Sequence, residues 1–326
     1  MSTGGERPDV AGFSLPIARF RFVGTTLGAL RLPEYEGSLL RGVFGAALRR
    51  TVCMTNLSDC KSCPLYRSCA YPEIFETPPR PTTFNQRFTE VPNPYVMEPS
   101  QRVPRVLNEG DDFEFSMVLI GLRALQQLPV IVHAWQRALR FGLGHSRIPV
   151  RLLKVYREDT SGEAGLVWDE ESQKITESES GLLVPLTTRA KDELILKIIT
   201  PLRLQNDGKP LFPADLNART LWMAAVRRVR LLAQLHAGLA PHAEISELLK
   251  DAALIVEDRS DLRWKNWKRY SSRQGQEMVL GGVVGHWKMS GPVERIWPWL
   301  WISQWCHLGK NATMGLGRFE LYAGPH

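Results

Sequence analysis

Hydrophobic and polar positions along the chain follow strand and helix periods, and the predicted elements come in an order that recurs. The first half has the pattern of a strand near Ala18 to Leu32 and of a helix, GSLLRGVFGAALRR, from Gly37 to Arg50. A strand is expected at Phe113 to Ile120, a helix at Leu122 to Arg140, and a last strand after a Gly-Leu-Gly turn. The first half is therefore predicted to mix strands and helices.

The second half predicts a similar order. Its expected elements are a strand, a helix, two strands, a helix and a last strand, at Leu194 to Leu204, Pro213 to Leu235, Arg263 to Tyr270, Met278 to Lys288, Pro292 to Cys306 and Arg318 to Tyr322. Tryptophans recur at helical spacing in RIWPWLWISQW, which is typical of a helix packed into a core.

Two pairs of matching segments indicate a duplication. Gly142-Leu143-Gly144 recurs as Gly315-Leu316-Gly317, and Leu30-Arg31-Leu32 recurs as Leu202-Arg203-Leu204. The spacing between the two copies is almost the same for both pairs. The order β-α-β-β-α-β describes a ferredoxin-like domain, so two copies predict an α+β tandem. We expect an N-terminal ferredoxin-like domain at 1–157 with a four-cysteine insertion at about 52–110, an acidic linker at 158–190, and a C-terminal ferredoxin-like domain with a glycine-rich loop at 191–326.

Composition and charge narrow the functional classes. Hydrophobic residues make up 44% of the chain and charged residues 23%, and no apolar run has the length of a membrane span, so a cytoplasmic globular protein is expected. The net charge of +7 is concentrated, because lysines and arginines between Arg259 and Arg273 face a single acid. Such clustering favours a polyanion partner over a solvated helix face. No P-loop or converging carboxylates support ATP hydrolysis or a two-metal nuclease.

Four of the five cysteines fall in one short segment. Cys53, Cys60, Cys63 and Cys69 have the spacing C-x6-C-x2-C-x5-C, which lets four thiolates converge on one ion. A structural zinc site fits this set, because a short segment without its own core needs a metal to order it. An iron–sulfur cluster would use the same ligands, and four ordinary thiols are the remaining alternative.

The C-terminal segments WKNWKRYSSRQGQEMVLGGVVGHW and HLGKNATMGLGRFEL resemble the CRISPR-associated endoribonucleases of the RAMP superfamily, which process precursor crRNA. The signature of that superfamily is a glycine-rich loop after the last helix of a ferredoxin-like domain, and the residues from Gly309 to Gly317 match it. The segment EGSLLRGVFGAALRR and the cysteine cluster before Ile74 are similar to one branch of the family, which carries a four-cysteine insertion.

The resemblance implies metal-independent cleavage within the CRISPR repeat. A ribose 2′-hydroxyl attacks the neighbouring phosphate and leaves a 2′,3′-cyclic phosphate and a 5′-hydroxyl, which requires a base, an acid and phosphate-binding cations. Many relatives supply a histidine in or just after the first helix, whereas this chain has none before His133. The candidate catalytic residues are therefore Tyr35, Arg49, Arg50 and His307.

The segment RWKNWKRYSSR alternates cations with aromatic residues, a pattern suited to single-stranded RNA or the base of a hairpin. Burial of its tryptophans in a core strand is the alternative. Glycines would let amides of the C-terminal loop approach a phosphate. The expected RNA-binding residues are Arg41, Arg263, Trp264, Lys265, Trp267, Lys268, Arg269, Tyr270, Ser271, Arg273, Gln274, His286, Gly309, Lys310, Gly315, Gly317 and Arg318.

Two other functions stay open at the level of sequence. One is a RAMP subunit that holds the crRNA handle without cutting it, and the other is a metal-stabilised RNA-binding module outside CRISPR systems. The expected partners are CRISPR repeat RNA or crRNA and other CRISPR effector subunits, and no membrane partner is expected.

Overall fold

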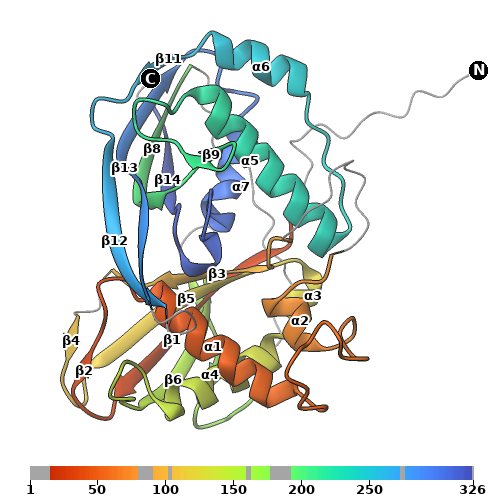
Figure 1. Ribbon diagram of the computed structural model, residues 1–326, viewed down its shortest axis with the longest axis vertical. Helices are drawn as coiled ribbons and strands as arrows, with labels where there is room; N and C mark the ends of the chain where they lie inside the picture. The colour runs from red at the N-terminus through yellow and green to blue at the C-terminus, as the bar shows by residue number, and fades with distance from the viewer. Residues whose placement is uncertain are drawn as a thin grey trace, which may run out of the picture.

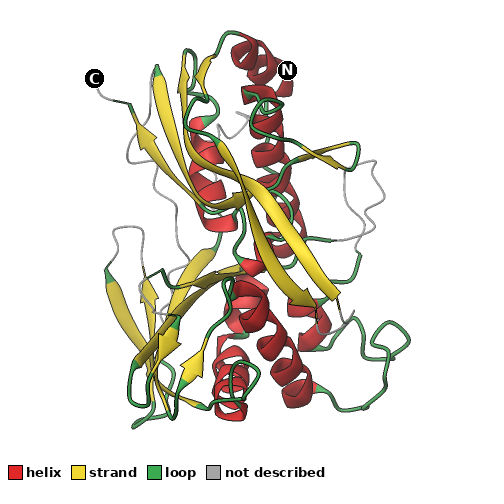
Figure 2. Ribbon diagram, turned by 60° about the vertical axis from the view of Figure 1, so that its left-hand side comes forward, coloured by secondary structure: helices red, strands yellow, loops and turns green. Residues whose placement is uncertain are grey.

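The chain folds into two halves, each with an antiparallel sheet that carries its main helices on one face (Figures 1 and 2). The computed structural model describes residues 15–79, 91–101, 105–158, 163–176, 192–271 and 276–324, apart from the side chains of 268–271 and 276–279. Within these ranges no helix has the length and apolar character to span a bilayer.

The N-terminal sheet has the strand order β3-β5-β1-β6-β7. Its strands are β1 (Ile17–Thr26), β3 (Tyr95–Pro99), β5 (Asp112–Ile120), β6 (Val150–Glu158) and β7 (Ala164–Asp169). The other elements are α1 (Gly37–Val52), α2 (Ala70–Phe75), α3 (Leu122–Gln126), α4 (Leu128–Phe141) and a ribbon of β2 (Leu30–Arg31) with β4 (Val106–Leu107). Burial alternates along β1 because successive side chains of a strand point to opposite faces.

The C-terminal sheet has the order β11-β13-β8-β14, and β12 pairs with β13. Its strands are β8 (Glu193–Leu202), β11 (Val256–Asp258), β12 (Arg263–Ser271), β13 (Gln276–Ser290) and β14 (Phe319–Ala323). The other elements are α5 (Ala218–Leu232), the π-helical turn η2 (Ala233–Ala237), α6 (Ile245–Ala253), α7 (Trp297–Cys306), the 3₁₀ turn η3 (Ala312–Met314) and a ribbon of β9 (Gln205–Asn206) with β10 (Lys209–Pro210).

Both halves follow one connectivity. The N-terminal order is β1-α1-β3-β5-α4-β6, and the C-terminal order is β8-α5-β12-β13-α7-β14. In the N-terminal sheet β1 pairs with both β5 and β6, and in the C-terminal sheet β8 pairs in the same way with both β13 and β14. Each half therefore has the β-α-β-β-α-β order of a ferredoxin-like domain, from which the sequence analysis predicted two such domains in tandem. The two Gly-Leu-Gly turns fall at equivalent places, after α4 and after α7.

Several boundaries differ from those expected. The segment predicted as one helix from Leu122 to Arg140 forms α3 and α4, and Pro129 stands in the first turn of α4, where its missing amide costs nothing. The strands β3 and β7 and the helix α6 were not anticipated. Because β7 pairs with β6, this part of the acidic segment extends the N-terminal sheet rather than linking the halves. Residues 177–191 of the expected linker lie outside the described residues.

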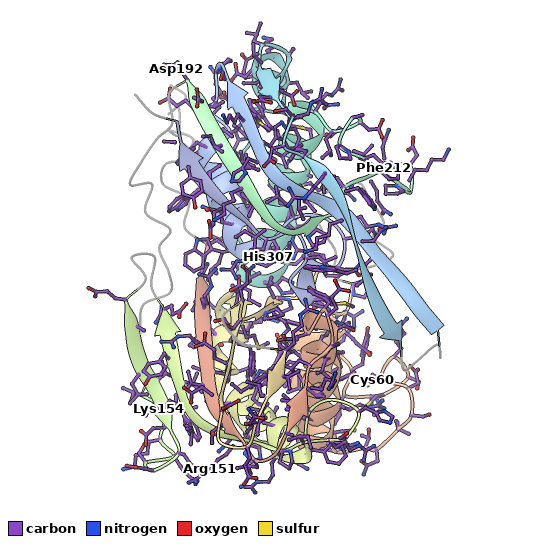
Figure 3. All side chains as sticks on the ribbon, turned by 90° about the vertical axis from the view of Figure 1, so that its left-hand side faces the viewer. Cys60, Arg151, Lys154, Asp192, Phe212 and His307 are labelled. Carbon is purple, nitrogen blue, oxygen red and sulfur yellow. The ribbon has the colours of Figure 1, made fainter. Side chains whose placement is uncertain are left out.

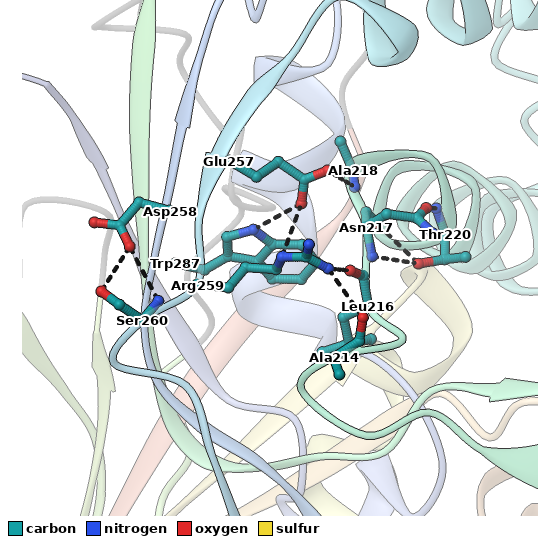
Figure 4. A network of polar contacts seen from close by, with 10 residues as sticks. All are labelled: Ala214, Leu216, Asn217, Ala218, Thr220, Glu257, Asp258, Arg259, Ser260 and Trp287. Carbon is teal, nitrogen blue, oxygen red and sulfur yellow. Dashed lines mark hydrogen bonds and ion pairs between the residues drawn. The ribbon is translucent and has the colours of Figure 1, made fainter.

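A polar network fixes the start of α5 (Figure 4). The side chain of Asn217 accepts the amide of Thr220, and the hydroxyl of Thr220 approaches the amide of Asn217, which forms a capping box. Glu257 on β11 accepts the amide of Ala218 at 3.0 Å and the indole N–H of Trp287 at 3.1 Å. The helix expected from Pro213 therefore begins at Ala218, where these groups satisfy its first amides.

The two halves meet where the turn after α7 packs on β3. The Cα of Gly315 is so close to the carbonyl oxygen of Met97 that any side chain there would overlap it. A small separate core forms beside this contact from Tyr35, Trp267, Leu280, Met314 and Leu316. The β12–β13 hairpin reaches from the C-terminal half toward α1 (Figure 1), which explains how Trp267 meets Tyr35.

A buried carboxylate contact also joins the halves beside His307, which lies between them in Figure 3. The Oε1 atom of Glu98 on β3 lies 2.9 Å from Nε2 of His307, and its Oε2 lies 2.8 Å from Nε of Arg19 on β1. Burial opposes the charge of Glu98, but Arg19, His307 and Arg318 together hold its pKa below the ordinary value. Burial lowers the pKa of His307 against the pull of Glu98, and Nε2 of its ring donates a hydrogen bond to the carboxylate.

We expect Glu98→Gln to destabilise the contact by about 3 kcal/mol, because it leaves the Arg19 guanidinium without its counter-charge. Urea unfolding at pH 7 measures this loss. Because the pKa of Glu98 is depressed, its contribution is complete above the ordinary carboxyl pKa and is lost as pH falls through the folded-state pKa, so the difference from wild type shrinks in acid.

Glu320→Gln is the matched control. Glu320 pairs with Lys197 at 3.0 Å, and both side chains are well exposed, so its loss is expected to cost less than about 1 kcal/mol. Equal effects of the two substitutions would show that the buried pair does not hold the halves together.

Candidate functional site

The C-terminal glycine loop is shaped by packing against β8. Side chains at Gly309 and Gly317, both at positive φ, would overlap the carbonyl oxygens of Arg203 and Leu308. The amide of Lys310 donates to the carbonyl of Arg203, and that of Gly317 donates to the carbonyl of Pro201, each at 3.0 Å. These amides are therefore committed within the protein, which contradicts the expectation that they hold a phosphate.

The two cations of the loop lie in different environments. Lys310 is exposed, whereas Arg318 is half-buried and lines a cavity of about 370 Å³ between the halves. That cavity also contains Arg19 and Arg21, but four glutamates offset the three arginines: Glu98, Glu114, Glu158 and Glu320. The cavity is therefore not a cationic pocket for a phosphate.

Tyr35 lies in the contact between the halves rather than on an open surface. Its ring stacks on Trp267 with centroids 4.4 Å apart, and its hydroxyl donates to the carbonyl of Met314. Both rings are more than nine-tenths buried. This placement contradicts the expected roles of Tyr35 at the scissile phosphate and of Trp267 as an open platform for a base.

Glu36, beside Tyr35, was missed by the sequence analysis. Its side chain is buried, and its Oε2 atom has no hydrogen-bond partner within the described ranges. Burial raises the pKa of Glu36 to about 7, although Arg105 acts in the opposite direction. No sequence signal distinguishes it, because an acid before a helix is an ordinary feature. It adds a group that titrates near neutrality to the contact between the halves.

Arg49 and Arg50 lie at the opposite end of α1 from this contact. Arg49 donates to the carbonyls of Leu57 and Ser58 at 2.6 and 2.9 Å, so it holds the cysteine segment. At ~1.5 Å per residue, Arg49 is about 18 Å along the helix from its start at Gly37.

The structure therefore does not bring the expected catalytic residues together. Tyr35, Arg49, Arg50 and His307 do not converge, and His307 is completely buried with both ring nitrogens facing protein oxygens. Arg41, an expected RNA contact, is half-buried, with its guanidinium 4.6 Å from the ring centre of Phe75.

His286 on β13 is an exposed imidazole held by a carboxylate. Its Nδ1 lies 2.7 Å from Oδ2 of Asp261, which also accepts the backbone amide of His286 at 2.9 Å. This bonding lowers the pKa of Asp261. Arg263 lies beside the pair, 3.8 Å from the other oxygen of Asp261. A ring whose Nδ1–H is held in this way presents Nε2 to solvent as a proton acceptor, which is the arrangement of a general base.

The described rings of the hairpin pack against other parts of the protein, and Nζ of Lys265 lies 5.1 Å from the ring centre of Trp267. Trp264 packs on Phe212 with centroids 4.5 Å apart, and its indole donates to Asn266 at 2.7 Å. Arg263 and Lys265 are exposed. The strand thus buries or packs its described tryptophans, while the side chains of Arg263 and Lys265 stay exposed. The side chains of Lys268, Arg269, Tyr270 and Ser271, and residues Arg273 and Gln274, lie outside the described residues.

The four clustered cysteines line one small pocket together with Arg49 and Tyr71. Backbone hydrogen bonding from Asn56 lowers the pKa of Cys53, which favours its thiolate. In the described part of the chain, no group of three or more His, Cys, Asp and Glu side chains is arranged to hold a metal ion. The fold thus brings the four cysteine sulfurs to one pocket, but it does not arrange them in the geometry of a metal site.

Each half of the chain matches a protein-family model. Residues 196–319 match the model of the CRISPR-associated endoribonuclease Cas6. Residues 15–180, half of the chain, match the model AF_1859_N, which is described as an N-terminal domain. None of the curated proteins matches the chain in sequence.

Solved structures share the fold. The product complex of Cas6 TTHB231, from Thermus thermophilus, has a TM-score of 0.56 at 14% identity over 95% of this chain and 100% of that one. The product complex of Cas6 TTHA0078 has a TM-score of 0.51 at 15% identity, covering 94% and 99% of the two chains. A partial Cas6-RT-Cas1–Cas2 complex gives 0.57 at 13% identity over 97% of this chain, which spans 47% of that longer one. The chain carries a domain of the CRISPR-associated endoribonuclease Cas6 type at residues 196–319, and through residues 15–180 it belongs to the AF_1859_N family.

Proposed function

We propose that the protein binds the repeat of a CRISPR precursor RNA and cleaves it in the cytoplasm to give crRNA. The match of residues 196–319 to the Cas6 endoribonuclease model carries this proposal. Two of the similar solved structures are product complexes, which supports an RNA partner. The similarity to a Cas6-RT-Cas1–Cas2 complex supports assembly with other CRISPR proteins.

In the proposed mechanism, Nε2 of His286 accepts the proton of a ribose 2′-hydroxyl. The 2′-oxygen forms a bond to the adjacent phosphorus while the bond from phosphorus to the 5′-oxygen breaks, and solvent protonates the departing 5′-oxygen. Asp261 holds the imidazole in the tautomer that can accept the proton, and Arg263 supplies positive charge beside the pair. The products are a 2′,3′-cyclic phosphate and a 5′-hydroxyl. In this step the imidazole of His286, rather than a metal-bound water, accepts the proton, so the step needs no metal.

A second candidate is a subunit that holds the crRNA handle without cutting. The absence of a histidine before His133 and the burial of Tyr35 and His307 favour this alternative.

Cleavage is tested with end-labelled RNA that carries the repeat of the host's own array, incubated with protein and EDTA. We expect one discrete cut, abolished by a single 2′-deoxy substitution at that site. His286→Gln is expected to lower the single-turnover rate at saturating RNA at least ~100-fold, the usual contribution of a general base. Its affinity for the 2′-deoxy repeat should stay unchanged, because glutamine can still hydrogen-bond.

The matched control is His242→Gln, which alters an exposed imidazole on the loop before α6 and should cleave at the wild-type rate. Wild-type activity in His286→Gln would exclude His286 as the base. Tight binding by the wild-type protein without any cut would favour the handle-holding candidate.

We further propose that Cys53, Cys60, Cys63 and Cys69 bind a structural zinc ion. Their common pocket supports this, as does the exposure of most residues between them, because such a segment has little core of its own. An iron–sulfur cluster is the alternative ligand for the same thiolates.

Elemental analysis of the purified protein should give about one zinc per chain, the content of a single four-thiolate site. We expect Cys60→Ser to lose the metal and to lower Tm. Cys306→Ala, which alters the buried cysteine of α7, should keep the metal. Visible absorbance with iron would identify a cluster instead, and protein prepared without oxygen that contains neither metal would refute the site.

A further inference from the structure

The first Gly-Leu-Gly turn has no place in the site described above, yet it is as tightly built as the second. Gly142 ends α4 at positive φ, and a side chain there would overlap the backbone of Arg147. The backbones of Leu143 and Ile148 exchange two hydrogen bonds of 2.8 and 3.0 Å. The chain therefore doubles back at once and returns Arg147 to the end of α4.

This turn gathers two arginines at one exposed aromatic ring. Phe141, the last residue of α4, is 51% exposed. The guanidinium carbon of Arg50, near the end of α1, lies 5.0 Å from the ring centre, and that of Arg147 lies 4.9 Å from it. Cation–π attraction holds each guanidinium, but the two positive charges repel one another. An anion between them would relieve that repulsion.

No carboxylate in the described part of the chain neutralises this cluster. Among the described residues, neither Arg50 nor Arg147 forms an ion pair, and the sequence has no Asp or Glu from Phe115 to Arg157 or within α1. Helix dipoles account for arginines at the ends of α1 and α4. They do not account for Arg147, which lies in the turn, or for the exposed ring.

We propose that the cluster of Arg50, Phe141 and Arg147 binds the phosphodiester backbone of the RNA, at a surface separate from the His286–Asp261 pair. The inference rests on the proposed function, because it takes RNA as the polyanion. Guanidinium forks match phosphate oxygens in pairs, and an exposed ring accepts an unstacked base. The first glycine turn then has a purpose of its own, which is to present Arg147.

Binding is measured by fluorescence anisotropy with repeat RNA that carries 2′-deoxy at the cleavage site, so that affinity is separated from cleavage. The double variant Arg50→Gln/Arg147→Gln should bind at least ~10-fold more weakly near physiological salt. The slope of log K against log salt should fall by about one for each lost phosphate contact. Phe141→Leu should weaken binding less, because it removes the ring and keeps both charges.

The matched control is Arg151→Gln. Arg151 is exposed on β6, but Glu170 already holds it at 2.8 Å, so its loss should change Kd less than about twofold. Circular dichroism melting should show that all variants keep the wild-type Tm, since the changed side chains are exposed.

The outcomes separate this inference from the proposed cleavage. Weaker binding by the double variant, together with a wild-type protein that does not cut, would support the cluster and refute the cleavage. Unchanged affinity and salt slope in the double variant would overturn the cluster, whatever the activity. Equal losses on duplex DNA of the same sequence would overturn the assignment to RNA, and absence of RNA binding by the wild type would overturn both proposals.

Discussion

The buried carboxylate of Glu98 is the interaction on which the arrangement of the two halves depends. It belongs to the N-terminal sheet and accepts a hydrogen bond from His307, at the start of the glycine loop of the other half. An isolated carboxylate in such a place would be strongly disfavoured, so its neighbours Arg19 and His307 must stay where they are. The loop that follows His307 is thereby fixed against β3 and against Tyr35.

The shared connectivity of the halves places one motif in two different surroundings. Each Gly-Leu-Gly turn follows the second helix of its half and lets the chain turn sharply into the last strand. In the C-terminal half the turn faces the other half, and its residues are buried in the contact between the two. In the N-terminal half Leu143 of the equivalent turn is also buried, but the residues that follow the turn, from His145 to Arg147, are exposed. Position in the tandem, rather than local sequence, separates the two roles.

This arrangement separates the enclosed residues at the contact between the halves from the exposed residues proposed to act on RNA. The residues closest to the contact between the halves, Tyr35 and His307, are enclosed by it, whereas His286 on β13 and Asp261 in the turn before β12 are exposed. The proposed RNA-binding cluster lies in the other half, at the ends of α1 and α4. A structured RNA bound to both surfaces would engage both halves, which the contact of Glu98 with His307 joins.

The sequence by itself determined the elements and their order, because strand and helix periods are local properties. It predicted α1 almost to its ends, the five-residue run of β14, and the matching turns of the two halves. It missed β3, a short strand that is buried almost throughout, because such a strand shows no alternation of apolar and polar residues. The four-cysteine cluster and the basic hairpin were also visible as patterns of residue type.

Only the tertiary structure decided which candidate residues are accessible. Burial and convergence depend on contacts between distant segments, such as Glu98 with His307 and Tyr35 with Met314, which no local pattern encodes. For the same reason Arg49 and Arg50 could not be excluded from the catalytic set until α1 placed them far from its start. The pairing of His286 with Asp261, and of Arg50 with Arg147 across one ring, likewise required the folded chain, because each joins residues from different elements.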